Sequence, residues 1–463
     1  MKLIELILSK FSEYAWGTHL LILLLGGGMF FMLYSRFLPF RYLGHAINVL
    51  RGKYDDPDEP GEISHFEALS SALAATVGMG NIGGVAVAIT MGGPGALFWM
   101  WVSAFLGMAT KFFTCSLAIM YRGHDSAGKL QGGPMYVIEE GLGKKWKPLA
   151  MFFAIAGLFG PLPVFQANQL TQIFRDVVLI PNDIIAEETL IVNLISGIVI
   201  AFLVSIVIFG GIKRIARVAS QMVPGMVVIY VLSVVYIITT NLEALPECFA
   251  LILTDAFSGK AVLGGSLGAV IVIGARRAAF SNEAGIGTAP LAHGAAKTKE
   301  PIREGLVAML GPAIDTLIVC TMTALAILIT DVWRTTDADG VTLTVNAFNK
   351  ALPTNNLGGY LLVLSVLTFS LSSLFTLSYY GTKCFSYIAG AHRAHYFNYF
   401  YVFSIILGSV ASISAIINLV DGMYGLMAIP TMISALLLAP KVRDAAKKYF
   451  DNVDHPTKKK VIN

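Results

Sequence analysis

Residues 72–94 read ALAATVGMGNIGGVAVAITMGGP, and this stretch decides how the rest of the chain is interpreted. It lies inside a run from Ala68 to Thr110 that contains no Asp, Glu, Lys, Arg or His, so we expect it in the membrane interior. Four glycines fall within seven of these residues, although each Gly inside a helix costs about 1 kcal/mol relative to Ala. Loosened backbone is tolerated at membrane depth only where it is buried in protein or lines a cavity. We therefore interpret the stretch as a broken membrane helix that binds a ligand; a small-residue face for helix packing is the alternative.

The composition is that of a membrane protein with many spans. Of the 463 residues, 56% are hydrophobic and 13% are charged, and the four cysteines form no C-x-x-C pair. The sequence contains no P-loop, zinc-protease or serine-hydrolase motif. We therefore expect neither an ATP-driven pump nor an enzyme, no cofactor and no nucleic-acid partner.

Apolar runs long enough to cross a bilayer predict an all-α membrane protein with about eleven transmembrane helices. With the N-terminus placed outside, most Lys and Arg residues fall in cytoplasmic segments, as the positive-inside rule requires. We expect a multi-pass protein of the plasma (inner) cell membrane, with its N-terminus outside and its C-terminus in the cytoplasm. The expected spans are 17–37, 66–92, 95–121, 148–174, 189–211, 218–240, 261–292, 304–330, 357–382, 396–420 and 422–440.

Without the first span, ten helices remain and divide into two sets of five. Each set begins with an interrupted helix, which reads TVGMGNIGG in the first set and ARRAAFSNEAGIGTAP in the second. The expected topology gives the two breaks opposite directions, a pattern typical of inverted-repeat transporters with a binding site at the midplane. We expect one polytopic domain with an extra N-terminal helix at 17–37, a first repeat at 62–240, a second at 247–440 and a basic cytoplasmic tail at 441–463.

The first interrupted helix offers two kinds of free backbone group. Its inner half is expected to end near Val77, which frees the carbonyl groups of Ala74, Thr76 and Val77 to bind Na⁺. Its outer half is expected to begin near Ile82, and the free N–H groups of a helix N-terminus suit a carboxylate. A zwitterionic ligand with a co-bound cation would use both ends.

The second interrupted helix carries charged and polar residues in an apolar segment. Charged groups at membrane depth mark ion pairs or transport pathways. For Arg276 and Glu283, which lie seven residues apart on one helix face, we favour an internal ion pair. Phe280, Ser281 and Asn282 precede the glycines of the break, where they would give a small molecule one apolar wall and two polar groups.

Three further spans place polar groups at membrane depth. Asp315 follows a proline in the eighth span, where it could bind a cation, carry a proton or lock a neighbouring broken helix. Gln166 follows two prolines in the fourth span, where it either lines a cavity or bonds between helices. In the ninth span, the carbonyl of Phe369 and the hydroxyls of Ser372 and Ser373 could supply three oxygens to a cation, although such hydroxyls also bond to their own helix.

Three blocks of the sequence resemble the alanine or glycine:cation symporters. They read GNIGGVAVAITMGGPGALFWMW from residue 80, GGPMYVIEEGLG at 132–143 and FSNEAGIGTAPLAHGAAKT at 280–298. The resemblance runs from about Glu67 to Tyr387. It implies the LeuT-type fold, with a 5+5 inverted repeat, two broken helices and one extra N-terminal helix. It also implies uptake of a small neutral amino acid with Na⁺, or in some members with H⁺.

The resemblance also implies roles for single residues. Leu377 stands where the family usually has Trp, so we expect an enlarged or reshaped pocket. The positions that match the substrate site are Thr76, Gly78, Met79, Gly80, Asn81, Gln166, Phe280, Ser281, Asn282, Ser373 and Leu377. Those that match the Na⁺ site are Val77, Phe369, Ser372 and Ser373, to which the free carbonyl of Ala74 is added.

These features predict a secondary active symporter that takes up alanine or glycine with Na⁺ by alternating access. A H⁺-coupled carrier of another neutral amino acid, such as glutamine, is the alternative within this class. An ion channel or an amino-acid-sensing receptor is the alternative from other classes. The expected partners are the amino acid, Na⁺ and the lipid bilayer, and a monomer is compatible with the sequence.

Overall fold

The chain folds into a bundle of helices. The computed structural model describes residues 2–185, 189–257, 267–338, 340–352, 357–410 and 414–454. The helices of the first half are α1 (Lys2–Ala15), α2 (Thr18–Tyr34), α3 (Leu38–Arg41), α4 (Leu43–Leu50), α5 (His65–Thr76), η1 (Gly80–Gly84), α6 (Val85–Gly92), α7 (Ala96–Met120), α8 (Pro134–Tyr136), η2 (Val137–Leu142), η3 (Lys144–Trp146), α9 (Lys147–Phe159), α10 (Val164–Phe174), η4 (Arg175–Leu179), α11 (Leu190–Ile208) and α12 (Gly211–Thr239). Those of the second half are η5 (Leu242–Ala244), α13 (Leu245–Ala256), α15 (Leu267–Asn282), α16 (Thr288–His293), α17 (Pro301–Ala308), α18 (Leu310–Pro312), η6 (Ala313–Cys320), α19 (Thr321–Ile329), α20 (Val332–Thr335), α21 (Gly340–Ala351), α22 (Leu357–Ala389), η7 (Ala391–Arg393), α23 (His395–Val410) and α24 (Ser414–Asp454). Within the described ranges, strands occur only in a short hairpin of β1 (Gly123–His124) and β2 (Leu130–Gln131).

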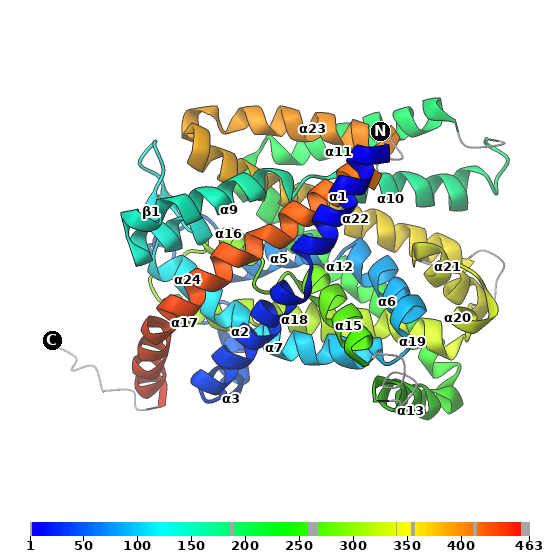
Figure 1. The fold of residues 1–463 in the computed structure, drawn as a ribbon, viewed down its shortest axis with the longest axis horizontal. Helices are drawn as coiled ribbons and strands as arrows, with labels where there is room; N and C mark the ends of the chain where they lie inside the picture. The colour runs from blue at the N-terminus through cyan, green and yellow to red at the C-terminus, as the bar shows by residue number, and fades with distance from the viewer. Residues whose placement is uncertain are drawn as a thin grey trace.

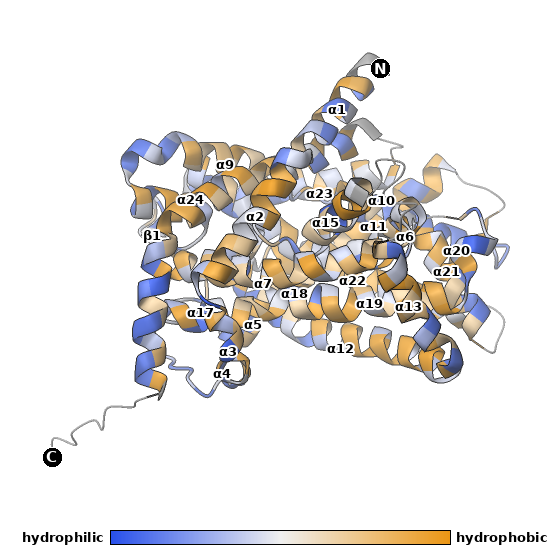
Figure 2. Cartoon of the chain, turned by 60° about the horizontal axis from the view of Figure 1, so that its bottom comes forward, coloured by the Kyte–Doolittle hydropathy of each residue, from blue (hydrophilic) through white to orange (hydrophobic). Residues whose placement is uncertain are grey.

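The outer face of the bundle is apolar, as a membrane protein requires. Eight helices of the described residues are long and apolar enough to cross a membrane, and α5 with η1–α6 forms a ninth, bent span. Figure 2, coloured by residue hydropathy, shows hydrophobic residues along most of the bundle, with hydrophilic residues gathered around β1 and the end of α24 and, at the opposite end, around α20. The two polar ends therefore mark the two faces of the membrane.

Most expected spans correspond to helices, with shifts at the two chain ends. The expected spans 261–292 and 396–420 each include residues outside the described ranges, and the parts that are described form α15, α16, α23 and the first residues of α24. The expected boundary between the last two spans at 421 is therefore wrong, because α24 already begins at Ser414. The N-terminal span begins earlier than expected, because the apolar segment formed by α1 and α2 runs from Glu5 to Tyr34. Helix α24 continues past residue 440 to Asp454, so the first part of the expected tail is helical, while residues 455–463 lie outside the described residues.

The first interrupted helix is bent where its sequence is richest in glycine. Helix α5 starts with a capping box, in which the Ser64 hydroxyl accepts from the Glu67 N–H at 3.2 Å and the Glu67 carboxylate accepts from the Ser64 N–H at 2.8 Å. It ends at Thr76, and Val77 takes an extended conformation with ψ 92°. The chain resumes as a short π-helical turn from Gly80, bent by 55° from α5.

The second interrupted helix breaks just after Asn282. Glu283 has a φ of 56° in the left-handed region, which is rare for a residue with a side chain, and Gly285 and Gly287 follow with φ of 86° and 106°. Helix α16 then begins at Thr288. Both expected breaks are therefore present in the structure.

The two broken helices lie at the centre of the bundle. Helix α5 packs against α12, α16 and α22, while α15 packs against α7. Around them, α1 lies along α24, as Figure 1 shows, and α24 also packs against α9. The main hydrophobic core includes Ala74, Val77, Met79 and Ile82 from the first break, so the loosened backbone is buried in protein and not exposed to lipid.

Candidate functional site

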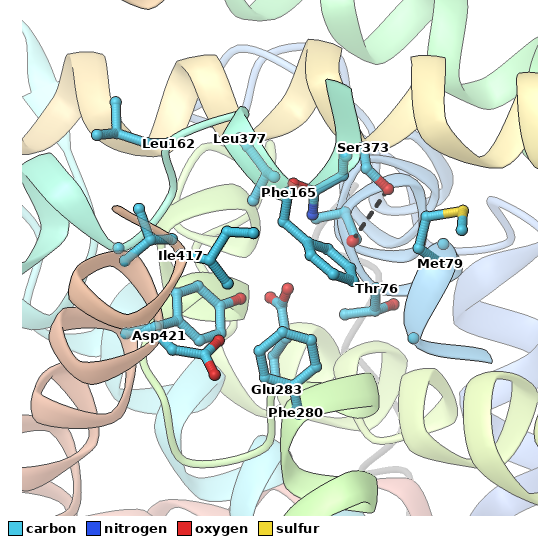
Figure 3. Close-up of a pocket in the computed structure, with 17 residues that line it drawn as sticks. Thr76, Met79, Leu162, Phe165, Phe280, Glu283, Ser373, Leu377, Ile417 and Asp421 are labelled. Carbon is cyan, nitrogen blue, oxygen red and sulfur yellow. Dashed lines mark hydrogen bonds between the residues drawn. The ribbon is translucent and has the colours of Figure 1, made fainter. Parts of the chain in front are cut away.

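A cavity of about 50 Å³ lies where the two breaks meet. About 10–15 Å³ of such volume holds one water molecule, so the cavity has room for a molecule of only a few non-hydrogen atoms. Figure 3 shows side chains converging on it from both broken helices and from neighbouring helices. Its lining consists of Ala75, Thr76, Gly78, Met79, Gly80, Gly160, Leu162, Phe165, Gln166, Phe280, Glu283, Ser373, Leu377, Ile417, Val420, Asp421 and Tyr424.

Most of the predicted substrate residues line this cavity. They are Thr76, Gly78, Met79, Gly80, Gln166, Phe280, Ser373 and Leu377. The remaining predicted residues, Asn81, Ser281 and Asn282, are buried beside the cavity and do not line it. Their side chains bind the neighbouring element η6 instead.

At the first break, the backbone presents free donors to the cavity. The side-chain oxygen of Asn81 accepts from the N–H of Gly78 at 2.8 Å and so fixes the turn. Among the hydrogen bonds of the described residues, none is donated by the N–H groups of Met79 or Gly80. Both residues line the cavity, so these N–H groups are available to an anionic ligand group at the start of a helical segment.

Asp315 joins the two broken helices behind the cavity. Its side chain is fully buried and accepts from the Asn81 amide at 2.7 Å and from the Ser281 hydroxyl at 2.9 Å. The Thr316 hydroxyl donates to the same carboxylate at 2.8 Å and accepts from the Asn282 amide at 3.1 Å. Of the three interpretations that the sequence left open for Asp315, these contacts favour the lock on the broken helices.

The expected ion pair between Arg276 and Glu283 is absent. Among the described residues, Glu283 makes no ion pair and accepts instead from the hydroxyl of Thr288. The guanidinium of Arg276 lies 5.9 Å from the ring centroid of Trp16, a residue between α1 and α2. The left-handed turn at Glu283 ends the helix, so the periodicity that predicted the pair does not extend that far.

Four of the predicted Na⁺ ligands, which are Ala74, Phe369, Ser372 and Ser373, are brought together between α5 and α22. The Ser372 hydroxyl lies 3.3 Å from the carbonyl oxygen of Ala74 and 2.9 Å from that of Phe369. The Ser373 hydroxyl lies 3.3 Å from the carbonyl oxygen of Ala75 and 3.0 Å from that of Phe369. These hydroxyls thus bond to their own helix and also reach the end of α5. Five oxygen atoms therefore lie together between the two helices: the two hydroxyls and the carbonyl oxygens of Ala74, Ala75 and Phe369.

The sequence reasoning missed the wall that α24 contributes. Ile417, Val420, Asp421 and Tyr424 line the cavity, but the expected spans placed Asp421 in a loop between two helices. An isolated acidic residue between two apolar runs was the signal that could have found this wall. From α10 and the turn before it, Phe165 and Leu162 were also missed, since apolar residues in an apolar span carry no distinguishing signal.

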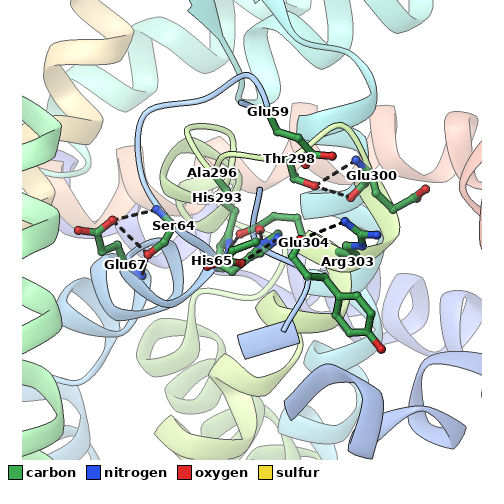
Figure 4. Close-up of polar contacts among 12 residues, drawn as sticks. Glu59, Ser64, His65, Glu67, His293, Ala296, Thr298, Glu300, Arg303 and Glu304 are labelled. Carbon is green, nitrogen blue, oxygen red and sulfur yellow. Dashed lines mark hydrogen bonds and ion pairs between the residues drawn. The ribbon is translucent and has the colours of Figure 1, made fainter. Parts of the chain in front are cut away.

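At the polar end near β1, a cluster of buried ionisable groups ties the two broken helices together. His65 starts α5 and His293 ends α16, and the Nδ1 atoms of both bind the fully buried carboxylate of Glu304, as Figure 4 shows. Next to them, Arg122 donates to the carbonyl oxygens of Gly294 at 3.0 Å and Thr298 at 2.9 Å. We call these four side chains the polar clamp.

Backbone hydrogen bonds next to the polar clamp hold the same segments together. The N–H of Lys297 donates to the carbonyl of Ile63 at 2.7 Å, and the N–H of Glu62 donates to that of Ala295 at 2.7 Å. Burial lowers the pKa of Arg122, although the negative charge of Glu304 opposes the shift. An Arg side chain stays charged at neutral pH even so. The segments that enter α5 and leave α16 are therefore held together on this side of the cavity.

Replacing Glu304 with Gln is expected to destabilise the protein. The variant leaves two buried imidazoles without their shared carboxylate, and breaking a buried pair in this way costs about 3–5 kcal/mol. A thermal unfolding midpoint of the purified protein well below that of the parent would bear this out. Glu13→Gln, at an exposed position on α1, is the control; equal midpoints for Glu304→Gln and the control would refute a stabilising role for the cluster.

Comparisons with known proteins identify the family of the chain. The sequence matches the sodium:alanine symporter family along residues 1–463. It is 38% identical to the sodium/alanine symporter AgcS of Methanococcus maripaludis, over 95% of each chain. It is 34% identical to the probable sodium/glutamine symporter GlnT of Bacillus subtilis, over 97% of this chain and 91% of that one.

Solved structures show the same architecture. The structure of MhsT in complex with L-phenylalanine matches with a TM-score of 0.58, covering 84% of this chain and 99% of that one at 13% identity. At this identity the likeness concerns the fold alone, which is the LeuT-like fold with its two broken helices. With the match along the whole chain and the identity to AgcS, it follows that the protein belongs to the sodium:alanine symporter family, a family of membrane transporters.

Proposed function

We propose that this chain takes up a small neutral amino acid together with Na⁺ by alternating access. The observation that carries the proposal is the cavity between the two breaks, which presents the free N–H groups of Met79 and Gly80 next to the carbonyl oxygens at the end of α5. The N–H groups suit the carboxylate of an amino acid, and the carbonyl oxygens suit a cation. A zwitterion and Na⁺ would together use both halves of the first break.

The Na⁺ ion is proposed to bind between α5 and α22. Its ligands would be the carbonyl oxygens of Ala74, Val77 and Phe369 and the hydroxyls of Ser372 and Ser373. Sodium is a hard cation that prefers oxygen ligands, and this set supplies five without a formal charge. Because Ser373 also lines the cavity, ion and substrate would be neighbours, which gives a direct physical route for their coupling.

The size of the cavity favours alanine or glycine as substrate. Its volume of about 50 Å³ holds about three to five water-sized positions, which is closer to the five or six non-hydrogen atoms of glycine or alanine than to the ten of glutamine. Leu377 lines the cavity at the position where the resemblance places a Trp. This residue would therefore help to set the largest substrate side chain that the cavity accepts. Glutamine transport, the activity in the name of the relative GlnT, would require the cavity to widen.

The polar clamp is proposed to close the cytoplasmic exit. The end of the molecule that carries it also carries the loop from Arg122 to Lys147, which holds five Lys and Arg residues and which the positive-inside rule places in the cytoplasm. The chain would then lie in the plasma (inner) membrane with its N-terminus outside. Inward opening of the carrier would require the contacts of Glu304 and Arg122 to separate, as alternating access demands.

Transport by purified protein in liposomes tests the proposal. An inward Na⁺ gradient should drive accumulation of labelled alanine or glycine, and unlabelled glutamine should compete weakly. A H⁺ gradient run in parallel separates the two coupling ions, while current without saturable uptake would indicate a channel and binding without uptake a receptor. If neither gradient drives uptake of any small neutral amino acid, the proposed function is wrong.

Removing either hydroxyl between α5 and α22 is expected to weaken the response to Na⁺. Each of Ser372→Ala and Ser373→Ala deletes one proposed ligand, and losing a contact to a charged group corresponds to about a 10- to 100-fold change in affinity. The measurement is the Na⁺ concentration that gives half-maximal alanine uptake. Ser220→Ala, at a half-buried site on α12, is the control; Na⁺ responses that match it in both variants would move the ion site elsewhere.

A further inference from the structure

Glu283 is a buried carboxylate that faces the cavity. Its side chain is 4% exposed, and Figure 3 shows the carboxylate pointing into the space between Phe165, Ile417 and Thr76. The residue sits at the second break with a left-handed φ of 56°, a conformation that costs a non-glycine residue free energy. An ionisable residue at membrane depth marks a functional site by default, with its partner to be identified.

Among the described residues, two acidic side chains line the cavity and no basic one does. Glu283 and Asp421 are both part of the lining, and the described residues of the lining include no Lys, Arg or His. Asp421 lies in the field of Arg276 and Arg277 on α15, which offset its charge. Glu283 lies in the field of Lys111 of α7, with which it makes no ion pair, and no cationic side chain reaches it from the cavity lining.

The neighbours of Glu283 use only part of the hydrogen-bonding capacity of its carboxylate. It accepts from the Thr288 hydroxyl, and the Tyr424 hydroxyl reaches it from α24. Lys111 on α7 is buried, does not line the cavity and makes no ion pair with Glu283. Its Nζ lies next to Gly311, 3.1 Å from the place that a Cβ on that glycine would occupy. A carboxylate offers about four acceptor sites, so capacity remains on the side that faces the cavity.

We propose that Glu283 binds the α-ammonium group of the transported amino acid, an inference that rests on the proposed function. Each of the two breaks then binds one charged group of the zwitterion. The N–H groups of Met79 and Gly80 hold the substrate carboxylate, and Glu283 holds the ammonium across the cavity. A small carboxylic acid without an amino group leaves Glu283 unpaired in a desolvated site, so the carrier rejects it.

The experiment compares L-alanine with L-lactate, in which a hydroxyl replaces the ammonium. Binding of each is measured by calorimetry in NaCl for the parent, Glu283→Gln, Glu283→Asp and the exposed control Glu243→Gln. The parent should bind alanine about 10- to 100-fold more tightly than lactate, as expected for a charge-assisted contact. Glu283→Gln should lose this preference mainly through weaker alanine binding, while Glu283→Asp should retain a preference for alanine.

Each result decides the inference. A parent protein that binds lactate as tightly as alanine overturns it, and so does a Glu283→Gln variant that keeps the full preference. Equal losses of alanine and lactate binding in both Glu283 variants also overturn it, because they indicate a role in holding the break only. A parent that binds no neutral amino acid at all contradicts the proposed function itself, and is thereby distinguished from a failure of the role of Glu283.

Discussion

Replacing Asp315 with Ala is expected to abolish alanine uptake and to lower the thermal stability of the protein strongly. The variant would leave the buried donors of Asn81, Ser281 and Thr316 without their acceptor. Each buried unsatisfied polar group costs about 1–3 kcal/mol, so the sum reaches several kcal/mol. Because Asn81 and Ser281 belong to the two broken helices, both halves of the cavity would lose their alignment.

Two measurements check this expectation. The thermal unfolding midpoint reports stability, and uptake into liposomes at equal protein amount reports activity. Asp315→Asn keeps a side-chain oxygen and should fall between the parent and Asp315→Ala, while Asp58→Ala, at an exposed position, should match the parent. Near-normal stability of Asp315→Ala together with lost Na⁺ dependence would instead make Asp315 a cation-binding or proton-carrying group.

Replacing Gly78 with Ala is expected to weaken the coupling to Na⁺ while leaving the fold intact. A Cβ at this position would lie 2.8 Å from the Oγ atom of Ser373. Gly78 does not have a positive φ, so the backbone accepts Ala, and the contact is relieved by turning the Ser373 hydroxyl away. That rotation would remove one proposed ligand of Na⁺. The Na⁺ concentration for half-maximal uptake should then rise about 10- to 100-fold, which corresponds to the loss of one hydrogen bond to a charged group.

The same break contains its own control. Gly84 lies six residues further along, and a Cβ added to it would meet no atom within 4 Å. Gly84→Ala should therefore transport like the parent, and could be slightly more stable because Ala favours helix. If Gly78→Ala and Gly84→Ala show the same Na⁺ response, the space next to Ser373 has no part in ion binding.

The sequence predicted the two breaks because their signals are local. Glycines, an amide and hydroxyls in runs that should be uniformly apolar stand out against the demands of the membrane interior. The same local reasoning found Gln166, which lines the cavity, and Ser372, whose hydroxyl reaches the end of α5.

What the sequence could not provide was direction. Asn81, Ser281 and Asn282 are next to the breaks, but their side chains turn toward η6, because Asp315 offers a buried acceptor there that lies far away in sequence. Glu283 turns into the cavity because the left-handed turn ends the helix that would have pointed it at Arg276. Both outcomes depend on tertiary contacts, which a periodicity on one helix cannot contain.

The long-range contact between Trp16 and α24 has a consequence for how the protein is made. The Trp16 indole donates to the carbonyl of Asp421 at 2.9 Å, across 405 residues of chain, and its ring lies 6.1 Å from that of Phe280 at the cavity wall. Helix α1 therefore finds its partner only after α24 has been synthesised, whereas α2 can pack against α7 much earlier. A chain that ends before α24 would lack the cavity wall formed by Ile417, Val420, Asp421 and Tyr424. Its helix α1 would keep an apolar face without the partner against which it packs, and transiently exposed apolar surface of this kind leads to misassembly.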